Sequence, residues 1–399
     1  MSRLDETIAD LTCSRASRRQ FMQRAAALGL TVPAMSLATR GTLLAQETKN
    51  KVVWVSPRGT LEVLDDYAYW VALKFGYFGD IETEILPAIL EATSSTKAVA
   101  DGQADMSFVS PGVFSLGVEA GIDLVSVFQV TGYDVFDLAL PKGNPQGITT
   151  FKDLEGKSMA LGDIGWSGIV DPMIKQAGGD LSKVKYVPAG SSWGQALQEG
   201  QADTALAWGG LRSQWLAGGL DFDYILGASW SKFPANSFQI RRTDFEDAAL
   251  DDLYTRYLRA YAMGYEFGHI NPRAATQITM EAEPIAAALQ ATFPDKNVAV
   301  QSFWELANNC RGNWPERNGG QWGWADLEGW NLFLQTTKEI GQLTKDIKAE
   351  DIISNKFVDA ANEFDLAQVQ ADSDAFVLSP EFEAVPEPAG AGTDGAYPM

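Results

Sequence analysis

The stretch that decides the fold occurs twice. Residues 97–112 read Lys97-Ala-Val-Ala-Asp-Gly-Gln-Ala-Asp-Met-Ser-Phe-Val-Ser-Pro-Gly112, and residues 195–210 read Gln195-Ala-Leu-Gln-Glu-Gly-Gln-Ala-Asp-Thr-Ala-Leu-Ala-Trp-Gly-Gly210; six of the sixteen positions are identical. In each copy an amphipathic helical pattern ends at a glycine that can adopt the left-handed cap, and a short apolar strand follows. The sequence therefore predicts a helix-turn-strand unit used in two similar lobes. The alternative is that Gly-Gln-Ala-Asp is a favourable turn that recurred by chance.

A second correspondence lies upstream of each copy. Residues 51–59 and 157–165 both have the pattern of a buried strand that runs into a glycine-containing loop and then a helix. Strands that alternate with helices predict an α/β fold with open, parallel-type sheets. In such sheets ligands bind outside the carboxyl ends of the strands. If the two copies face one another, a cleft is lined from both sides.

The first 45 residues predict an export signal. Arg18 and Arg19 form a twin-arginine pair followed by Phe21, and a weakly apolar run and small residues come next. This order is typical of a removable signal for the twin-arginine translocase, and the run is shorter than the roughly 20 residues that a membrane-spanning helix needs. We expect a periplasmic protein.

Charge and residue usage exclude several classes of function. The formal net charge is −21 at pH 7, which makes nucleic acids and anionic membrane surfaces poor partners. His269 is the only histidine, so neither a Cys/His zinc cluster nor a two-histidine metal face can form. It lies where a helix is predicted to end at Gly268, so we interpret it as a capping residue. No catalytic residue, metal or cofactor is predicted.

The domain organisation follows from length and turn signals. A chain of 399 residues exceeds the roughly 250–300 at which a single core stops growing. We predict the signal at 1–45, lobe 1 at 46–140, lobe 2 at 141–240, a helical return to lobe 1 at 241–366 and a disordered acidic Pro/Gly tail at 367–399. The crossing to lobe 2 is placed at the turn-rich segment 141–147, and the return near 238–241.

The segment 142–162, which contains Asp153-Leu-Glu-Gly-Lys157, resembles the signature of the nitrate/sulfonate/taurine and thiamine-pyrimidine-precursor family of substrate-binding proteins. The paired Gly-Gln-Ala-Asp motifs and the late segments 329–334, 347–353 and 355–358 are also similar to it. The resemblance covers about residues 51–362. The chain departs from the family pattern in a tryptophan-rich stretch, 304–330, which suggests an insertion.

The resemblance implies a type II periplasmic-binding fold, in which two α/β lobes joined by two crossing strands close on a ligand. It also implies docking on the permease of an ABC importer, whose ATPase supplies the energy of uptake. We expect a monomer that is not an enzyme.

Candidate ligand-binding residues lie in the loops at the strand ends and early in the first helix. They are Arg58, Asp66, Tyr67, Ser110, Pro111, Tyr133, Trp166, Ser167, Trp193 and Trp208. Each has a structural alternative, because loop serines often cap helices and tryptophans usually pack in cores.

Three lobe 2 loops each carry a tryptophan, which predicts an aromatic platform for a flat or cationic solute. Ser167 and the backbone N–H groups of 165–168 instead favour an anionic or polar group. Arg58 suits a carboxylate or sulfonate, whereas Asp66 and Tyr67 suit an amino-bearing ligand. We therefore predict capture of a small polar aromatic, heterocyclic or sulfonate-like solute, and the sign of its charge stays open.

Two other functions remain as alternatives. One is an enzyme of the pyrimidine-synthase type on the same fold, for which only His269 could serve as the histidine. The other is a ligand-sensing periplasmic protein whose lobes contact a membrane receptor.

Overall fold

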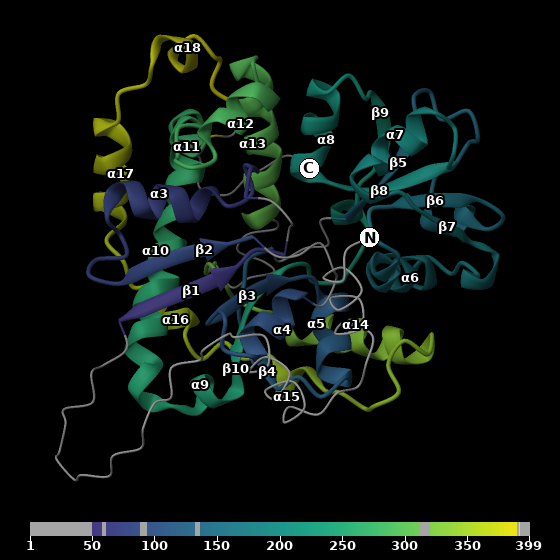
Figure 1. Cartoon of the computed structure of the whole chain (residues 1–399), viewed down its shortest axis with the longest axis horizontal. Helices are drawn as coiled ribbons and strands as arrows, with labels where there is room; N and C mark the ends of the chain where they lie inside the picture. The colour runs from purple at the N-terminus through teal and green to yellow at the C-terminus, as the bar shows by residue number, and fades with distance from the viewer. Residues whose placement is uncertain are drawn as a thin grey trace, which may run out of the picture. The chain divides into compact units, whose positions relative to one another are not determined.

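The computed structural model describes residues 50–57, 61–87, 94–131, 136–311, 320–388 and 391. Within these ranges the strands form two five-stranded sheets covered by helices (Figure 1). We call the sheet that contains the first strand, with its helices, lobe 1, and the other sheet with its helices lobe 2. The predicted α/β class with two lobes is confirmed. The predicted signal, with Arg18, Arg19 and Phe21, lies outside the described residues.

The two sheets have the same topology. The strands of lobe 1 in spatial order are β2 (Glu82–Leu86), β1 (Lys51–Val55), β3 (Met106–Val109), β10 (Ser237–Arg241) and β4 (Leu124–Gln129). Those of lobe 2 are β7 (Lys185–Pro188), β6 (Ser158–Leu161), β8 (Thr204–Trp208), β5 (Phe136–Pro141) and β9 (Phe222–Ile225). The first three strands of each list run parallel, and the fourth is antiparallel to both its neighbours. The sheets are therefore mixed, where the sequence predicted a parallel type.

The antiparallel fourth strand is in each case the strand by which the chain arrives from the other lobe. The return through β10 is where the sequence predicted it, but the first crossing is earlier than predicted. Because β5 already pairs with β8 and β9, the chain leaves lobe 1 before Phe136. The turn-rich segment 141–147 lies inside lobe 2, where Gly143 donates its N–H to Asp223 at 2.8 Å.

Helices follow the strands in both lobes and then dominate the return to lobe 1. Those between the strands are α3 (Tyr67–Phe75), α4 (Ser94–Ala100), α5 (Pro111–Glu119), α6 (Ser167–Gln176), α7 (Trp193–Gln198) and α8 (Gly209–Ala217). Those after β10 are α9 (Arg242–Glu246), α10 (Asp251–Ile270), α11 (Pro272–Met280), α12 (Ala286–Thr292), α13 (Lys296–Arg311), α14 (Leu327–Glu339), α15 (Ala349–Ile352), α16 (Val358–Ala361), α17 (Leu366–Ala375) and α18 (Pro380–Glu383). None of the helices in the described ranges combines the length and apolarity needed to span a lipid bilayer.

The repeated motif makes the same turn in both lobes. Gly102 has φ of 73° and Gly200 has φ of 70°, the left-handed region that glycine adopts without steric cost. Asp105 accepts the N–H of Val53 at 2.9 Å, and Asp203 accepts the N–H of Ser158 at 2.8 Å. Each motif therefore ends one helix and ties the next strand to the neighbouring parallel strand. The predicted helix-turn-strand repeat is confirmed.

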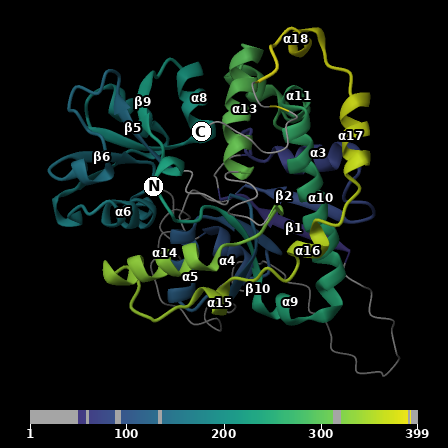
Figure 2. The same cartoon turned by 180° about the vertical axis from the view of Figure 1, so that it is seen from behind.

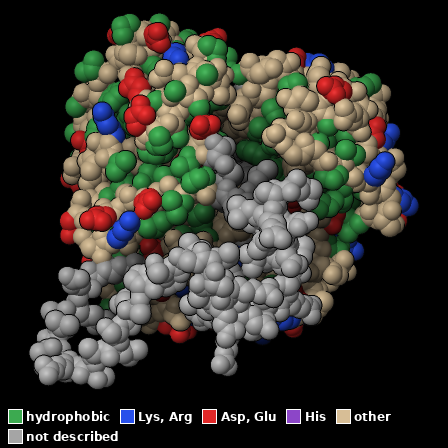
Figure 3. Space-filling view, in the orientation of Figure 1, with side chains coloured by type: hydrophobic (Ala, Val, Ile, Leu, Met, Phe, Trp, Pro, Cys, Tyr) green, Lys and Arg blue, Asp and Glu red, His purple; other side chains and the backbone are tan. Residues whose placement is uncertain are grey.

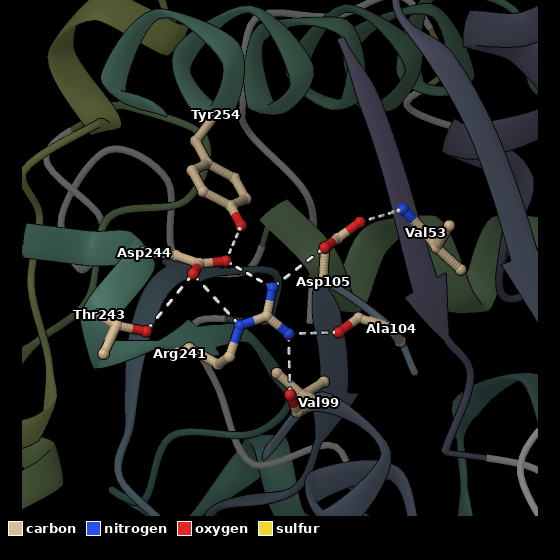
Figure 4. A network of polar contacts seen from close by, with 8 residues as sticks. All are labelled: Val53, Val99, Ala104, Asp105, Arg241, Thr243, Asp244 and Tyr254. Atoms are coloured by element: carbon tan, nitrogen blue, oxygen red, sulfur yellow. Dashed lines mark hydrogen bonds and ion pairs between the residues drawn. The ribbon is translucent and has the colours of Figure 1, made fainter. Parts of the chain in front are cut away.

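The lobe 1 copy carries an additional ion-pair network (Figure 4). Arg241, at the end of β10, donates to Asp105 at 3.1 Å and to Asp244 at 2.6 Å. It also donates to the carbonyl oxygens of Val99 at 2.8 Å and Ala104 at 2.7 Å, which belong to the end of α4 and the turn after it. The returning strand is thus fastened to the repeat of lobe 1 by one half-buried side chain.

Side-chain alternation builds the core of lobe 2 on both faces of its sheet. Leu206 packs with the large apolar residues of one face, and Ala205 and Ala207 pack with the alanine-rich cluster of the other. In lobe 1 the core is aromatic. The ring of Trp54 lies 5.7 Å from that of Phe238, measured between centroids, and the indole is 1% exposed.

The end of the chain differs from the prediction. Residues 367–388, predicted to be disordered, instead include most of α17 and all of α18. Val369, Phe382 and Val385 are buried in the core of lobe 1. The Pro, Gly and Glu content of this segment suggested disorder, but its spaced apolar side chains pack on the core of lobe 1, and Arg273 donates to the carbonyl oxygens of Glu383 and Val385. Residues 392–399 lie outside the described residues.

Among the described residues, helices of the two lobes pack on one another in two regions. Helix α8 of lobe 2 packs on α13 of lobe 1, and α6 of lobe 2 packs on α5 and α14 of lobe 1. At the second contact a Cβ added to Gly112 would lie 2.5 Å from the carbonyl oxygen of Gly168, so the two backbones approach closely. Figure 2 shows α14 beside α5 and α15, and the Trp330 and Phe114 rings join α14 to α5 at 5.9 Å.

Candidate functional site

The strongest candidate site lies at the carboxyl ends of three neighbouring strands of lobe 2. Trp166 ends the short turn after β6, Trp193 begins α7 after β7, and Trp208 is the last residue of β8. Because β6 is parallel to both β7 and β8, the three strand ends meet at one edge of the sheet. We call these three residues the tryptophan trio.

The three indoles are in mutual contact. The rings of Trp193 and Trp208 are stacked with 5.9 Å between centroids and 27° between planes. Trp166 meets both edge-on, at 5.3 Å from Trp193 and 6.0 Å from Trp208. Each is half-buried, so part of the cluster remains accessible to solvent. The trio thus lies together as the sequence predicted, and contact with a solute stays a prediction.

A hydrogen bond and a further aromatic contact hold Trp193 of the trio in place. Trp193 donates its indole N–H to the carbonyl oxygen of Leu206 at 2.8 Å, which fixes the ring plane. Trp215, which the sequence analysis missed, packs edge-on against Trp193 at 5.6 Å and is 7% exposed. The available signal was a further tryptophan in α8, the helix that follows Trp208 directly.

The predicted anion site at the start of α6 is largely used by the protein itself. Gly165 donates its N–H to the Asp163 carboxylate at 2.8 Å. Trp166 donates its backbone N–H to the carbonyl oxygen of Asp163 at 3.0 Å. Ser167 begins α6, and its carbonyl oxygen accepts from Gln342 at 3.4 Å. Gly168 is covered by Gly112 of lobe 1.

Of the lobe 1 candidates, Ser110 and Pro111 have structural roles at the start of α5. The Ser110 hydroxyl accepts the N–H of Val113 at 3.4 Å, and Pro111 occupies the first turn. This is the N-cap arrangement typical of serine followed by proline.

Tyr67 is fully buried. Its ring lies 4.6 Å from that of Phe303 and 5.5 Å from that of Tyr265, so it belongs to the core of lobe 1 and not to a solute-facing surface. This burial does not favour contact between Tyr67 and a solute, and the predicted contact stays a prediction. Asp66 is 5% exposed. Arg58 and Tyr133 lie outside the described residues.

A charged cluster around α8, the helix that follows Trp208, was not predicted. Arg212 of α8 makes a short ion pair with Asp137 of β5 and a longer one, at 3.5 Å, with Glu305 of α13 in lobe 1. The Asp137 side chain is 2% exposed and also accepts the N–H of Gly227 at 3.0 Å. Burial raises the pKa of Asp137 to about 6, although Arg212 and the Gly227 N–H oppose this rise. An aspartate inside the apolar strand 136–141 was the available signal.

Asp65 was also missed. It precedes α3 in lobe 1, and its Oδ2 lies 3.5 Å from where a Cβ on Gly210 of α8 would be. Ser302 of α13 donates its hydroxyl to the carbonyl oxygen of Gly210 at 3.1 Å. The first turn of α8, which begins directly after Trp208, therefore lies against lobe 1. Figure 3 shows a recess in the surface where the two lobes meet.

His269 lies in the last turn of α10, near the helix C-terminus as predicted, and it is buried. Helix α10 ends at Ile270 and not at Gly268. Gly268 instead packs closely on Tyr67, because an added Cβ would lie 2.5 Å from that ring. His269 is 2% exposed and its ring lies 5.7 Å from Trp304 and 5.3 Å from Trp322. In the described part of the chain, no group of three or more His, Cys, Asp or Glu side chains is placed to hold a metal ion.

A family model described as NMT1/THI5 like matches residues 66–275, more than half of the chain. The chain belongs to the NMT1/THI5-like family. The match begins just before α3, spans all of lobe 2 and ends in α11, so it contains both Gly-Gln-Ala-Asp units of this family member. No curated protein sequence matches the chain.

Solved structures share the fold of this NMT1/THI5-like protein. The periplasmic aliphatic sulphonate binding protein SsuA from Escherichia coli has a TM-score of 0.57 at 13% identity, over 76% of this chain and 92% of its own. The alkanesulfonate-binding protein SsuA from Xanthomonas axonopodis pv. citri, bound to MOPS, has a TM-score of 0.54 at 12% identity, over 76% and 98%. A Candida albicans protein described as having the generic periplasmic binding protein fold scores 0.53 at 11% identity, over 77% and 96%. The fold is therefore that of periplasmic binding proteins.

Proposed function

We propose that this protein is the periplasmic substrate-binding component of an ABC importer. It captures a small polar aromatic, heterocyclic or sulfonate-like solute between its lobes and delivers it to a membrane permease, without making or breaking a bond. Export by the twin-arginine pathway and action as a monomer are part of this proposal.

The observation that carries the proposal is the tryptophan trio. Three half-buried indoles meet at the carboxyl ends of parallel strands, which is where ligands bind in open α/β sheets. The contacts of α8 with α13 and of Gly112 with Gly168 support a mechanism in which the lobes close on the solute. The likeness to two sulfonate-binding proteins of the same fold supports the transport role.

The environment of His269 supports binding over catalysis. A histidine that is 2% exposed and packed against two tryptophan rings has no access to a solute at the trio. An enzyme on this fold would convert its ligand, whereas a binding protein would not. Incubation followed by mass spectrometry should therefore return the solute unchanged.

The test is a thermal-shift screen of the full chain against sulfonates, aromatic acids, pyrimidines, amino-bearing heterocycles and small oxyanions. A solute at a hundred times its Kd should add about 2.7 kcal/mol to the unfolding free energy. If the whole panel leaves the melting temperature unchanged, the proposed function is wrong for these solute classes.

Variants then locate the site. Trp166→Ala or Trp208→Ala should abolish binding and leave the melting temperature nearly unchanged. Trp330→Ala is the control, because this fully buried indole of lobe 1 should cost about 3–5 kcal/mol of stability without contacting the solute. If the trio variants unfold as Trp330→Ala does, the trio is core and the site lies elsewhere.

A further inference from the structure

We propose that lobe 1 carries a second small-molecule site, separate from the tryptophan trio. It binds a compact zwitterion with an apolar side chain, the chemical class of the apolar α-amino acids. The site is a cavity between α3, α11 and the segment that follows α17. Its lining residues all belong to lobe 1, so this inference does not rest on the proposed function.

The cavity has the size of a small-molecule site. Its volume is about 410 Å³, within the range of roughly 300–1,000 Å³ that is typical of ligand pockets. Helix α3 contributes Trp70 and Lys74 to its lining, α11 contributes Ile278, and the segment after α17 contributes Phe376 and Val377. In Figures 1 and 2 these helices lie on the edge of lobe 1 that is farthest from lobe 2.

The segment that completes the cavity is held in place by contacts with the rest of lobe 1. Asp372 of α17 accepts the hydroxyl of Tyr77 at 3.0 Å. Ser379 donates its backbone N–H to the Oε1 of Gln277 at 3.0 Å, and the amide of Gln277 donates to Glu281 at 2.9 Å. The cavity is therefore formed before a ligand arrives, and little ordering is needed on binding.

The indole N–H of Trp70 is a buried donor that lacks an acceptor. The side chain is 5% exposed, and its Nε1 has no hydrogen-bond partner among the described residues. Buried donors are nearly always paired, because leaving one unpaired costs free energy. Since the Trp70 side chain lines the cavity, a ligand that brings a carboxylate oxygen against this indole supplies the missing acceptor.

The charged side chains of the lining have both signs. Lys74 lies on the α3 side of the cavity, and Glu281 and Glu283 lie just after the end of α11. All three are exposed, and within the part of the chain that the structure describes none of them forms an ion pair. A ligand with one anionic and one cationic group matches both signs, whereas a simple anion or cation matches only one.

The mouth of the cavity is apolar. Leu73 is 49% exposed and Val377 is 85% exposed, the highest value for a large apolar side chain in the described ranges. Single exposed apolar residues are common, but these two border the same cavity, with Ile278 and Phe376 beside them. A ligand with an apolar side chain removes this surface from water. Together with the charges, this indicates an amino acid of the leucine or methionine kind.

The experiment titrates L-leucine, L-isoleucine and L-methionine into the full chain by calorimetry. Leucine methyl ester, which lacks the negative charge, and N-acetyl-leucine, which lacks the positive charge, are the comparison ligands. We expect leucine to bind, and each analogue to bind about fivefold more weakly or worse, because it loses one of the two charge matches. In ¹H–¹⁵N spectra the indole resonance that is lost in Trp70→Phe should move when leucine is added.

Variants locate the site. Lys74→Gln and Trp70→Phe should each weaken leucine binding about threefold to tenfold, since each removes one donor. Glu281→Gln is a surface variant that should act in the same way should Trp70→Phe fail to fold. Lys175→Gln, on the exposed face of α6 in lobe 2, and Trp230→Phe are the matched controls. The indole N–H of Trp230 is also buried and unpartnered, but it lies on the core of lobe 2.

The outcomes separate this inference from the proposed function. If none of the three amino acids binds, or if both analogues bind as well as leucine does, the inference is wrong. Leucine binding that is lost in Trp208→Ala and kept in Lys74→Gln also overturns it, because the amino acid then binds at the trio, and that result supports the proposed function. Leucine binding at the cavity of a chain that binds no solute at the trio would leave this inference standing and the proposed function without support.

Discussion

The two Gly-Gln-Ala-Asp units show how one local solution is put to different uses. At 102–105 and 200–203 the turns have the same glycine conformation and the same bond from the aspartate to a neighbouring strand. They differ in what surrounds that aspartate. In lobe 1 it pairs with Arg241, whereas in lobe 2 it accepts from the exposed amide of Gln146 at 2.7 Å.

They differ again at the strand that follows. β3 runs into Ser110 and Pro111, which cap and start α5, whereas β8 ends in Trp208 and a glycine pair. The comparison teaches that the repeat specifies the helix-turn-strand scaffold. Side chains from distant parts of the chain then decide whether a copy is held by an ion pair or carries residues that could bind a solute. The following predictions test this difference, beginning with the largest effect.

Arg241→Met should be the most damaging change at the repeat. It leaves Asp105 and Asp244, each 14% exposed, without their shared counter-charge and removes two donors to backbone carbonyls. We expect a loss of about 3 kcal/mol in unfolding free energy, measured by urea denaturation. The lobe 2 counterpart, Gln146→Ala, should cost under about 1 kcal/mol. Similar losses for both variants would contradict the proposed difference between the copies.

The buried aspartate of lobe 2, Asp137, should make stability depend on pH. The pKa of Asp137 is about 6 in the folded protein, above its usual value of about 3.9 in an unfolded chain. Between pH 4 and pH 6 the folded state therefore holds a proton that the unfolded chain releases. The unfolding free energy should fall as pH rises through this window, by on the order of 2 kcal/mol.

Asp137→Asn isolates this effect from the titration of the many other carboxylates. Subtracting the pH profile of the variant from that of the wild type should leave a slope confined to pH 4–6. Parallel profiles would show that the Arg212 pair keeps the pKa of Asp137 near that of an ordinary aspartate.

Replacing the two repeat aspartates should reveal the same asymmetry at smaller scale. Asp105→Asn should cost about 1.5 kcal/mol because it weakens the pair with Arg241, and Asp203→Asn about 1 kcal/mol because its partners are uncharged. Chemical denaturation of both variants measures the difference. A larger loss from Asp203→Asn would reverse the ranking of the two copies.

The turn glycines should behave alike. Gly102→Ala and Gly200→Ala each force a side chain into the left-handed region, and in both cases an added Cβ meets no atom within 4 Å. The cost should be about 1 kcal/mol at each site, and equal within error. Unequal losses would mean that the two turns are less equivalent than their bonds indicate.

Local patterns were sufficient for much of the fold. The helix-turn-strand units, the strands at 51 and 158 and the return near 238–241 depend on apolar periodicity and turn glycines, which act over a few residues. The meeting of Trp166, Trp193 and Trp208 also followed from sequence, because parallel strands bring their carboxyl ends to one edge.

Other features depended on contacts that no local pattern records. The Pro and Gly residues of 141–147 are a strong local signal for a turn, and we therefore predicted the crossing between lobes there. The chain already belongs to lobe 2 from Phe136 onward. The composition of 367–388 indicated disorder, yet Phe382 and Val385 are buried in the core of lobe 1, among residues that include some more than 100 positions earlier in the sequence. Tyr67 was predicted to face a ligand but is buried by helices that come much later in the chain.

The sequence by itself determined the class of fold, the repetition of its unit and the edge at which the tryptophans gather, because these depend on short-range propensity and strand direction. Only the tertiary structure decided which charged side chains meet around α8. Asp65, Asp137, Arg212 and Glu305 are up to 240 residues apart, and their proximity arises from the packing of α8 against α13. Electrostatic attraction acts through space and depends on distance, and in a two-lobed protein those distances are set by how the lobes meet.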